Sequence, residues 1–203
     1  GFHEPYLMGA NRRAGVGAPD YVKYMLSRPV KVQPGSEFVY STADSILAGR
    51  MVEKAVGKRL SEYLYERFFE PLGQGFPIWE NCPQGHPIGG GGMFMTLSNM
   101  LKIGQVYLMD GKWKGQQLVD PAWIKEATAK QIETPNPGND IWVCGYGYQF
   151  WRNPYEDSYR ADGAYGQLTM VLPKKGLIVA IQCPESGDLN KVKPVMHELI
   201  LSL

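Results

Sequence analysis

The sequence has few cysteines, no excess of either charge and no long apolar run. Its cysteines, Cys82, Cys144 and Cys183, are scattered and form no Cys-x-x-Cys pair. We therefore expect buried free thiols rather than a zinc site or a disulfide framework. The 21 basic and 20 acidic residues form no basic block, so nothing marks a surface for nucleic acid or anionic membrane. The longest strongly apolar run, residues 177–181, is far too short to span a membrane.

The composition is that of a globular protein. Hydrophobic residues make up 44% of the chain and charged residues 20%, which excludes a wholly disordered or fibrous chain. The 203 residues suit a single domain, 1–203, that can bury a sizeable core. The sequence begins with Gly1 and shows no signal peptide. If the natural N-terminus was removed, any targeting segment was removed with it, so the sequence leaves the compartment open.

Capping signals and the spacing of apolar residues predict where the helices and strands lie. Residues 1–17 have the composition of a loop. Capping residues, prolines and glycines predict helices at 20–27, 43–56, 61–69, 96–109, 120–131 and 191–201. From Gly145 the period changes from 3.6 to 2, which predicts strands at 145–151, 164–172 and 176–183. This order predicts an α+β fold, an antiparallel sheet flanked by helices.

Two short motifs carry the functional signal. The first is Tyr40-Ser41-Thr42, which follows the extended segment 34–39 and opens the helix expected at 43–56. The second is Asp162-Gly163-Ala164, which leads into a hydrophobic strand. Each has a purely structural alternative, because Ser41 and Thr42 are good helix caps and Tyr40 can pack beside a helix start.

Together the two motifs resemble the second and third active-site motifs of the serine β-lactamase-like and penicillin-binding-protein-like hydrolases related to class C β-lactamases. Other segments share the resemblance, namely RFFEPLG at 67–73, the glycine run at 89–92 and GYGYQFW at 145–151. The family's first motif, Ser-x-x-Lys on a helix, occurs nowhere in the chain. We therefore expect this chain to form the C-terminal part of the family's fold, without the first two strands of the sheet and without the helix that carries the nucleophile.

The resemblance implies a serine hydrolase that acts through an acyl-enzyme on an ester, amide or lactam, without metal or cofactor. Tyr40 would relay protons. A phenol titrates near ~10, so it does this only where a nearby ammonium favours the phenolate or a relay forms. Gly163 would let substrate lie against the strand backbone, and the Ala164 N–H would stabilise the oxyanion. The alternative for Gly163 is a bend in a core strand.

The resemblance also implies that Ser41, Thr42 and Asp162 contact substrate. It favours a periplasmic or secreted location and a small-molecule substrate, with no nucleic acid and no membrane span. We further expect self-association through an exposed sheet edge. The alternative function is a non-catalytic, truncated or degenerate homologue that binds a ligand or partner, and the absent Ser-x-x-Lys favours this for the polypeptide as it stands.

Family members that recognise penicillins have a lysine and a hydroxyl at the third motif, where this chain has Ala161 and Asp162. A free Asp162 carboxylate would disfavour acidic substrates and favour neutral or amine-bearing ones. The alternative is that Asp162 pairs with Arg160 or a backbone amide and leaves the site neutral. The glycine run is not followed by Gly-Lys-Ser or Gly-Lys-Thr, so we expect a tight loop rather than a phosphate cradle. His86 is expected at the surface, with substrate contact as the alternative.

Overall fold

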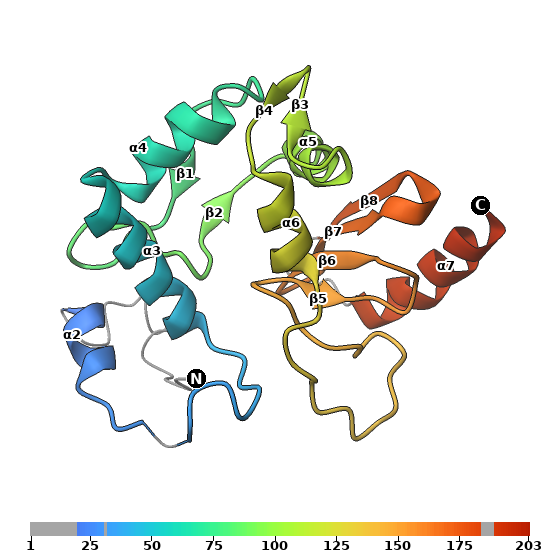
Figure 1. Ribbon diagram of the computed structural model, residues 1–203, viewed down its shortest axis with the longest axis horizontal. Helices are drawn as coiled ribbons and strands as arrows, with labels where there is room; N and C mark the ends of the chain where they lie inside the picture. Colours follow the sequence, from blue (N-terminus) through green and yellow to red (C-terminus); the bar gives the residue numbers. More distant parts are fainter. Residues whose placement is uncertain (1–19, 31, 184–188) are drawn as a thin grey trace. The chain divides into compact units, whose positions relative to one another are not determined.

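The computed structural model describes residues 20–30, 32–183 and 189–203 (Figure 1). The loop expected over residues 1–17 lies outside these ranges. The mixture of helices and antiparallel strands confirms the expected α+β fold.

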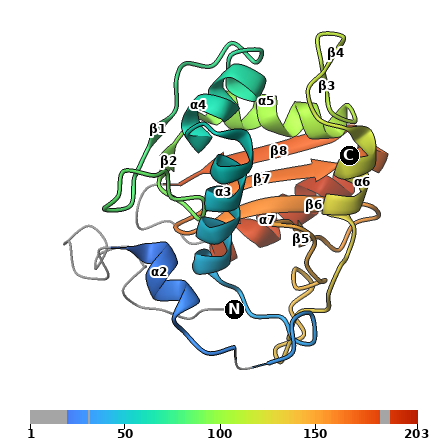
Figure 2. The ribbon, with the colours of Figure 1, turned by 60° about the vertical axis from the view of Figure 1, so that its left-hand side comes forward.

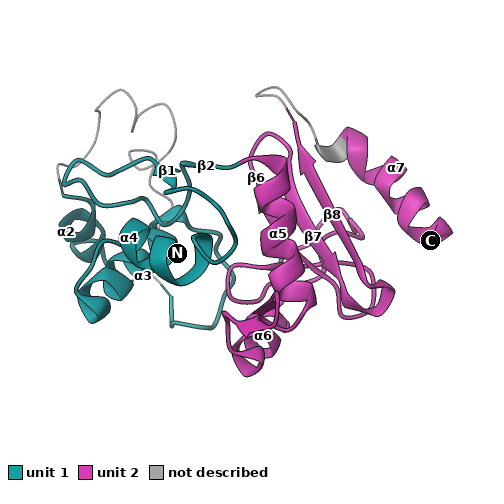
Figure 3. Ribbon diagram, turned by 90° about the horizontal axis from the view of Figure 1, so that it is seen from above, with its two compact units in different colours: residues 1–95 teal, residues 96–203 magenta. Residues whose placement is uncertain are grey.

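The chain forms two compact units, Gly1–Met95 and Thr96–Leu203 (Figure 3). In the first unit, the elements are α2 (Tyr21–Leu26), α3 (Thr42–Val56), α4 (Leu60–Leu64), the π-helical turn η2 (Tyr65–Phe69), β1 (Ile78–Trp79) and β2 (Met93–Phe94). β1 and β2 pair antiparallel.

Local capping chemistry sets the helix boundaries of this unit. The Asp20 side chain accepts a hydrogen bond from the Lys23 N–H at 2.9 Å and begins α2. Gly57 ends α3 in the left-handed conformation with φ 71°, which a residue without a Cβ adopts without strain. The buried core of this unit, to which α2, α3 and the segment after β1 contribute, consists of Tyr21, Met25, Ala43, Ile46, Cys82 and Ile88. Cys82 is therefore a buried free thiol, as expected, whereas Cys144 and Cys183 are free and half-buried.

In the second unit, the elements are α5 (Leu97–Leu108), β3 (Lys112–Trp113), β4 (Gln116–Gln117), α6 (Pro121–Thr128), β5 (Trp151–Arg152), β6 (Tyr159–Gly163), β7 (Gln167–Leu172), the 3₁₀ turn η3 (Pro173–Lys175), β8 (Leu177–Gln182) and α7 (Leu189–Ser202). The main sheet has the antiparallel order β5-β6-β7-β8 (Figure 2). As expected, Thr96 caps α5 and Asp120 caps α6 ahead of Pro121.

Alternation along β7 gives the sheet two buried faces. Leu168, Met170 and Leu172 point to one face, where they pack with Met196 and Ile200 of α7. The opposite face meets α5 at Gly104, where a Cβ would lie 3.1 Å from Thr169 Cγ2. Figure 3 shows α5 and α7 on opposite sides of β7 and β8. A strand buried on both sides reads as a continuous apolar run, which is what 168–172 shows apart from Thr169.

The prediction of a strand over 145–151 is wrong except at the end of this range. β5 contains only Trp151 and Arg152. Upstream, the Gly147 N–H donates to the Phe150 carbonyl at 2.7 Å, and Gln149 has φ 69°. This left-handed residue closes a tight turn, which interrupts the extended conformation.

The strand expected over 164–172 begins three residues later than expected. Residues 164–166 form the turn of the β6–β7 hairpin, with φ 63° at Tyr165 and φ 83° at Gly166. The last strand pair is Gly163 with Gln167. The second motif therefore lies at the end of β6 and in the turn, ahead of the strand that the apolar run predicted.

No helix in the described part of the chain combines the length and the apolar composition that crossing a membrane requires.

We expect self-association through β8. This strand is last in the sheet order, and no strand of the described ranges pairs with its outer edge. Its sequence, LIVAIQ, is apolar, and an apolar edge strand is a template for pairing with another chain. Sedimentation velocity over a concentration series should show a dimer or larger species. A monomer at every concentration, with one cooperative thermal transition, would contradict this expectation.

Candidate active site

The first motif lies where an extended segment enters α3. Tyr40 precedes the helix and is 55% exposed. Ser41 is the N-cap residue, and its side chain accepts a hydrogen bond from the Asp44 N–H at 3.3 Å. Thr42 is the first residue of the helix. The capping role proposed for Ser41 is therefore confirmed, and Thr42 follows the cap instead of forming it.

The loop between β1 and β2, residues 80–92, packs against the first two turns of α3 (Figure 2). A Cβ on Gly90 would lie 2.6 Å from Thr42 Cγ2 and 2.7 Å from the Thr42 carbonyl oxygen. A Cβ on Gly89 would collide with the Ser45 carbonyl oxygen. The glycine run is thus a close-packed support for the first motif, which agrees with the expected tight loop.

Trp79 anchors this loop. Its Nε1–H donates to the carbonyl oxygens of Ile88 and Gly91, each at 2.9 Å. The Ile88 N–H donates to the Glu80 carbonyl at 3.0 Å, and the Glu80 N–H donates to the Gly92 carbonyl at 2.9 Å. These bonds satisfy backbone groups that a tight loop would otherwise leave unpaired.

The second motif lies on a partly unpaired edge of the sheet. β7 pairs with all five residues of β6, whereas β5 pairs only with Tyr159 and Arg160. Within the described ranges, no strand occupies the β5 side of residues 161–163. Ala164 follows as the first, exposed residue of the turn. A backbone edge with Gly163 at its end can accept an extended group without side-chain obstruction.

A buried arginine positions this edge. The sequence indicated Arg160 as a possible partner of Asp162 but did not reveal its burial or its other contacts. Arg160 is 3% exposed, and its Nη1 donates to the Asn153 Oδ1 at 2.8 Å and to the Arg152 carbonyl at 3.0 Å. Its Nε donates to the Asp162 Oδ2 at 2.9 Å. The guanidinium also lies 5.9 Å from the centre of the Trp142 ring. Asp162 thus pairs with Arg160, the alternative that leaves the site neutral.

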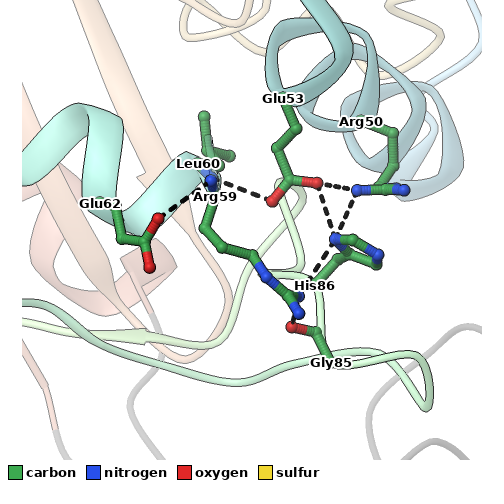
Figure 4. Close-up of polar contacts among 7 residues, drawn as sticks. All are labelled: Arg50, Glu53, Arg59, Leu60, Glu62, Gly85 and His86. Carbon is green, nitrogen blue, oxygen red and sulfur yellow. Dashed lines mark hydrogen bonds and ion pairs between the residues drawn. The ribbon is translucent and has the colours of Figure 1, made fainter. Parts of the chain in front are cut away.

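A second polar cluster lies near the other end of α3 (Figure 4). Glu53 is buried at 7% exposure, and its Oε1 accepts a hydrogen bond from the Leu60 N–H at 2.9 Å. Its Oε2 lies 2.9 Å from His86 Nδ1 and also pairs with Arg50. Arg59 donates to the Gly85 carbonyl, and its Nη1 lies 3.2 Å from His86 Nδ1.

His86 is half-buried in this cluster, not at the surface as expected. Burial, followed by the charges of Arg50 and Arg59, lowers the pKa of His86 below its ordinary value of 6.5. Each of these effects disfavours the imidazolium form. The cluster joins residues more than thirty positions apart, and no motif spacing reveals such a contact.

The site residues predicted from the sequence fall into two groups, one in each compact unit. Tyr40, Ser41 and Thr42 belong to the first unit, and Asp162, Gly163 and Ala164 belong to the second. No group of three or more metal-ligating side chains occurs in the described residues.

Residues 3–191 match the family model described as Beta-lactamase, so the chain belongs to the β-lactamase family. A protein of Escherichia coli strain K12 named "Putative D-alanyl-D-alanine carboxypeptidase" is 42% identical over 45 residues, which are 22% of this chain and 10% of that protein.

Two solved structures share the fold. The "Putative 6-aminohexanoate-dimer hydrolase from Bacillus anthracis" has a TM-score of 0.76 and 17% identity, covering 100% of this chain and 55% of that one. A penicillin-binding protein from Bacillus halodurans has a TM-score of 0.69 and 18% identity, covering 88% of this chain and 62% of that one. The chain therefore spans little more than half the length of these structures.

Proposed function

We propose that the protein containing this chain is a serine hydrolase that acts through an acyl-enzyme on an ester, amide or lactam. Because the chain has no Ser-x-x-Lys, the serine and lysine would come from outside these 203 residues. The finding that carries the proposal is the family match over residues 3–191. The hydrolase of similar fold supports it.

In the proposed reaction, the serine Oγ attacks the carbonyl carbon of the substrate while its proton passes to the lysine and Tyr40. A serine hydroxyl is a weak nucleophile until a neighbouring group accepts this proton. The carbonyl oxygen gains a negative charge, towards which the Ala164 N–H would donate. The bond to the leaving group then breaks, the leaving group takes up the proton, and water hydrolyses the acyl-enzyme.

The edge of β6 supports substrate binding at the second motif. Residues 161–163 have no strand on their β5 side among the described residues, so an extended substrate could hydrogen-bond to this backbone. Gly163 would keep a side chain from intervening, and Ser41 and Thr42 would supply hydroxyl contacts. The Asp162 carboxylate is already paired at 2.9 Å with Arg160, so we propose a site that is less repulsive to acidic substrates than a free carboxylate would make it.

A fluorophosphonate probe tests this proposal. Residues 1–203 alone should form no adduct, because they contain no candidate pair for attack and proton removal. The whole protein should be labelled on one serine, and Tyr40→Phe should slow labelling about 10²-fold by removing a proton relay. Mass spectrometry locates the adduct and gives its rate of formation.

Tyr148→Phe is a matched control, because Tyr148 is also exposed and lies outside both motifs. It should leave the labelling rate unchanged. An adduct on a serine of residues 1–203 would contradict the assignment of the nucleophile. A whole protein that resists labelling would favour the non-catalytic alternative.

A further inference from the structure

Four residues of α3 face the 80–92 loop along one side of the helix. Thr42, Ser45 and Gly49 face the glycine loop, since a Cβ on Gly89 or Gly90 would meet Ser45 or Thr42 and a Cβ on Gly49 would lie 3.6 Å from Gly89 Cα. Glu53 continues this row. Steps of three, four and four residues keep side chains on one face of an α-helix.

The loop touches this row at both ends. Gly89 and Gly90 pack on the first two turns of α3, and His86 meets Glu53 at 2.9 Å, about three turns from the start of the helix. The loop is folded on itself around Pro87, because the Cys82 N–H donates to the His86 carbonyl at 2.8 Å and the Ile88 N–H donates to the Glu80 carbonyl at 3.0 Å. His86 and Ile88 are therefore held on the same side of the loop, next to Gly89. A displacement of His86 would therefore be transmitted to the glycines.

We propose that Glu53 is a positioning residue, which holds the 80–92 loop through His86 against the first turns of α3, directly after Tyr40 and Ser41. The catalytic consequence rests on the function proposed above, whereas the link between Glu53 and the loop does not. A carboxylate buried at 7% exposure is retained only where it is paired and hydrogen-bonded, and Glu53 meets this requirement from three separate segments of the chain.

The two oxygens of Glu53 have separable roles. Oε1 accepts from the Leu60 N–H, which satisfies an amide at the start of α4. Oε2 faces His86 and Arg50. A glutamine at position 53 can keep the first contact with its carbonyl oxygen but presents an amide N–H group to His86 and Arg50 in place of a carboxylate oxygen. When the His86 hydrogen is on Nδ1, one donor then faces another, so Glu53→Gln removes the link to the loop and leaves the cap of α4 in place.

Hydrogen exchange of Glu53→Gln tests the link. Exchange of the Cys82 and Ile88 amides in the loop should accelerate about tenfold, the equivalent of one lost charge-assisted hydrogen bond. The Leu60 amide should keep its protection. Glu62→Gln is the matched control, because Glu62 accepts from the Arg59 N–H near the same helix start and should leave loop exchange unchanged. If Glu53→Gln leaves loop exchange at the wild-type rate, the proposal is overturned.

An NMR titration of His86 gives a readout that a simple packing role would not change. The groups facing His86 are Glu53, Arg50 and Arg59, so loss of the only negative charge among them should lower the pKa of His86 further. Since the folded-state pKa lies below the ordinary value, the contribution of His86 to the stability of the wild-type protein is complete above about pH 6.5 and declines as the pH falls below it. An unchanged His86 titration in Glu53→Gln would contradict the proposed pairing.

Labelling of the whole protein tests the catalytic consequence. Glu53→Gln should slow fluorophosphonate labelling about tenfold, with the half-saturating probe concentration unchanged, because the reacting groups are displaced while the probe still binds. Faster loop exchange with a normal labelling rate would overturn the positioning role. If the wild-type protein takes up no probe but loop exchange responds to Glu53→Gln, the proposed function fails and the link is retained.

Discussion

Arg160→Met should lower the free energy of unfolding by about 3–5 kcal/mol, the cost of removing one partner of a buried ion pair. Arg160 is 3% exposed, and its guanidinium holds Asp162, Asn153 and the Arg152 carbonyl. Without it, a carboxylate of which 20% is exposed keeps its charge without a partner, and three other acceptors, the Asn153 Oδ1 and the Arg152 and Trp142 carbonyls, lose this donor. Urea unfolding followed by circular dichroism measures the loss.

Two further variants test this explanation. In Arg160→Met combined with Asp162→Asn, no unpaired charge is left behind, so the double variant should be more stable than Arg160→Met alone. Lys174→Met is a surface control, because Lys174 pairs at 3.4 Å with Glu156 and with Asp157 where all three side chains are exposed. It should leave the free energy of unfolding nearly unchanged, because ion pairs between exposed side chains contribute little to stability. Equal losses for Arg160→Met and Lys174→Met would refute the role given to Arg160.

Gly89→Ala should lower the free energy of unfolding by about 1–3 kcal/mol, the usual cost of overpacking. The added Cβ would collide with the Ser45 carbonyl oxygen and lie 3.2 Å from the Ser45 carbonyl carbon. Both are backbone atoms of a helix, so neither can move aside as a flexible side chain would. Thermal or urea unfolding of the purified variant measures the effect.

Gly75→Ala is the matched control for this substitution. Gly75 belongs to the same unit, and a Cβ there would have nothing within 4 Å. Without a steric conflict, the alanine should stabilise the chain slightly or leave it unchanged. If Gly89→Ala and Gly75→Ala behave alike, the loop does not approach α3 as closely as described.

Helix boundaries were largely predictable from the sequence because capping is local. Asp20, Ser41, Gly57 and Thr96 each act on backbone groups within four residues of themselves, so their identity and position suffice to predict them. The same holds for Asp120 ahead of a proline at the first helical position.

The alternating aromatic residues at 145–151 predicted a strand that did not form, because their rings pack against different partners. Phe150 lies 5.1 Å from the ring of Tyr107, whereas Tyr148 stacks 5.6 Å from Trp123. Aromatic residues at every second position occur in a strand, but they also occur in a turn in which each aromatic ring packs on a different neighbour. Only tertiary contacts distinguish the two cases.

The two motifs of the candidate site were recognisable from the sequence, but their supports were not. Glu53 lies in the helix predicted at 43–56, whereas Arg160 lies between the strands predicted at 145–151 and 164–172. Both residues are charged, and charged residues usually face solvent. Their burial depends on partners such as Asn153 and His86, which only the folded chain brings together. The pairing of Asp162 with Arg160 was foreseen as one of two alternatives, and the structure has that pair.

The row of contacts along α3 restricts how this part of the chain can vary in length. Inserting one residue between Ser45 and Glu53 would turn the second half of the helix by about 100° and move Glu53 away from His86. Inserting about seven residues would restore the direction but lengthen the helix by roughly 10 Å, so the 80–92 loop would have to lengthen with it. Insertions and deletions among relatives should therefore occur in this helix and this loop together, or in neither.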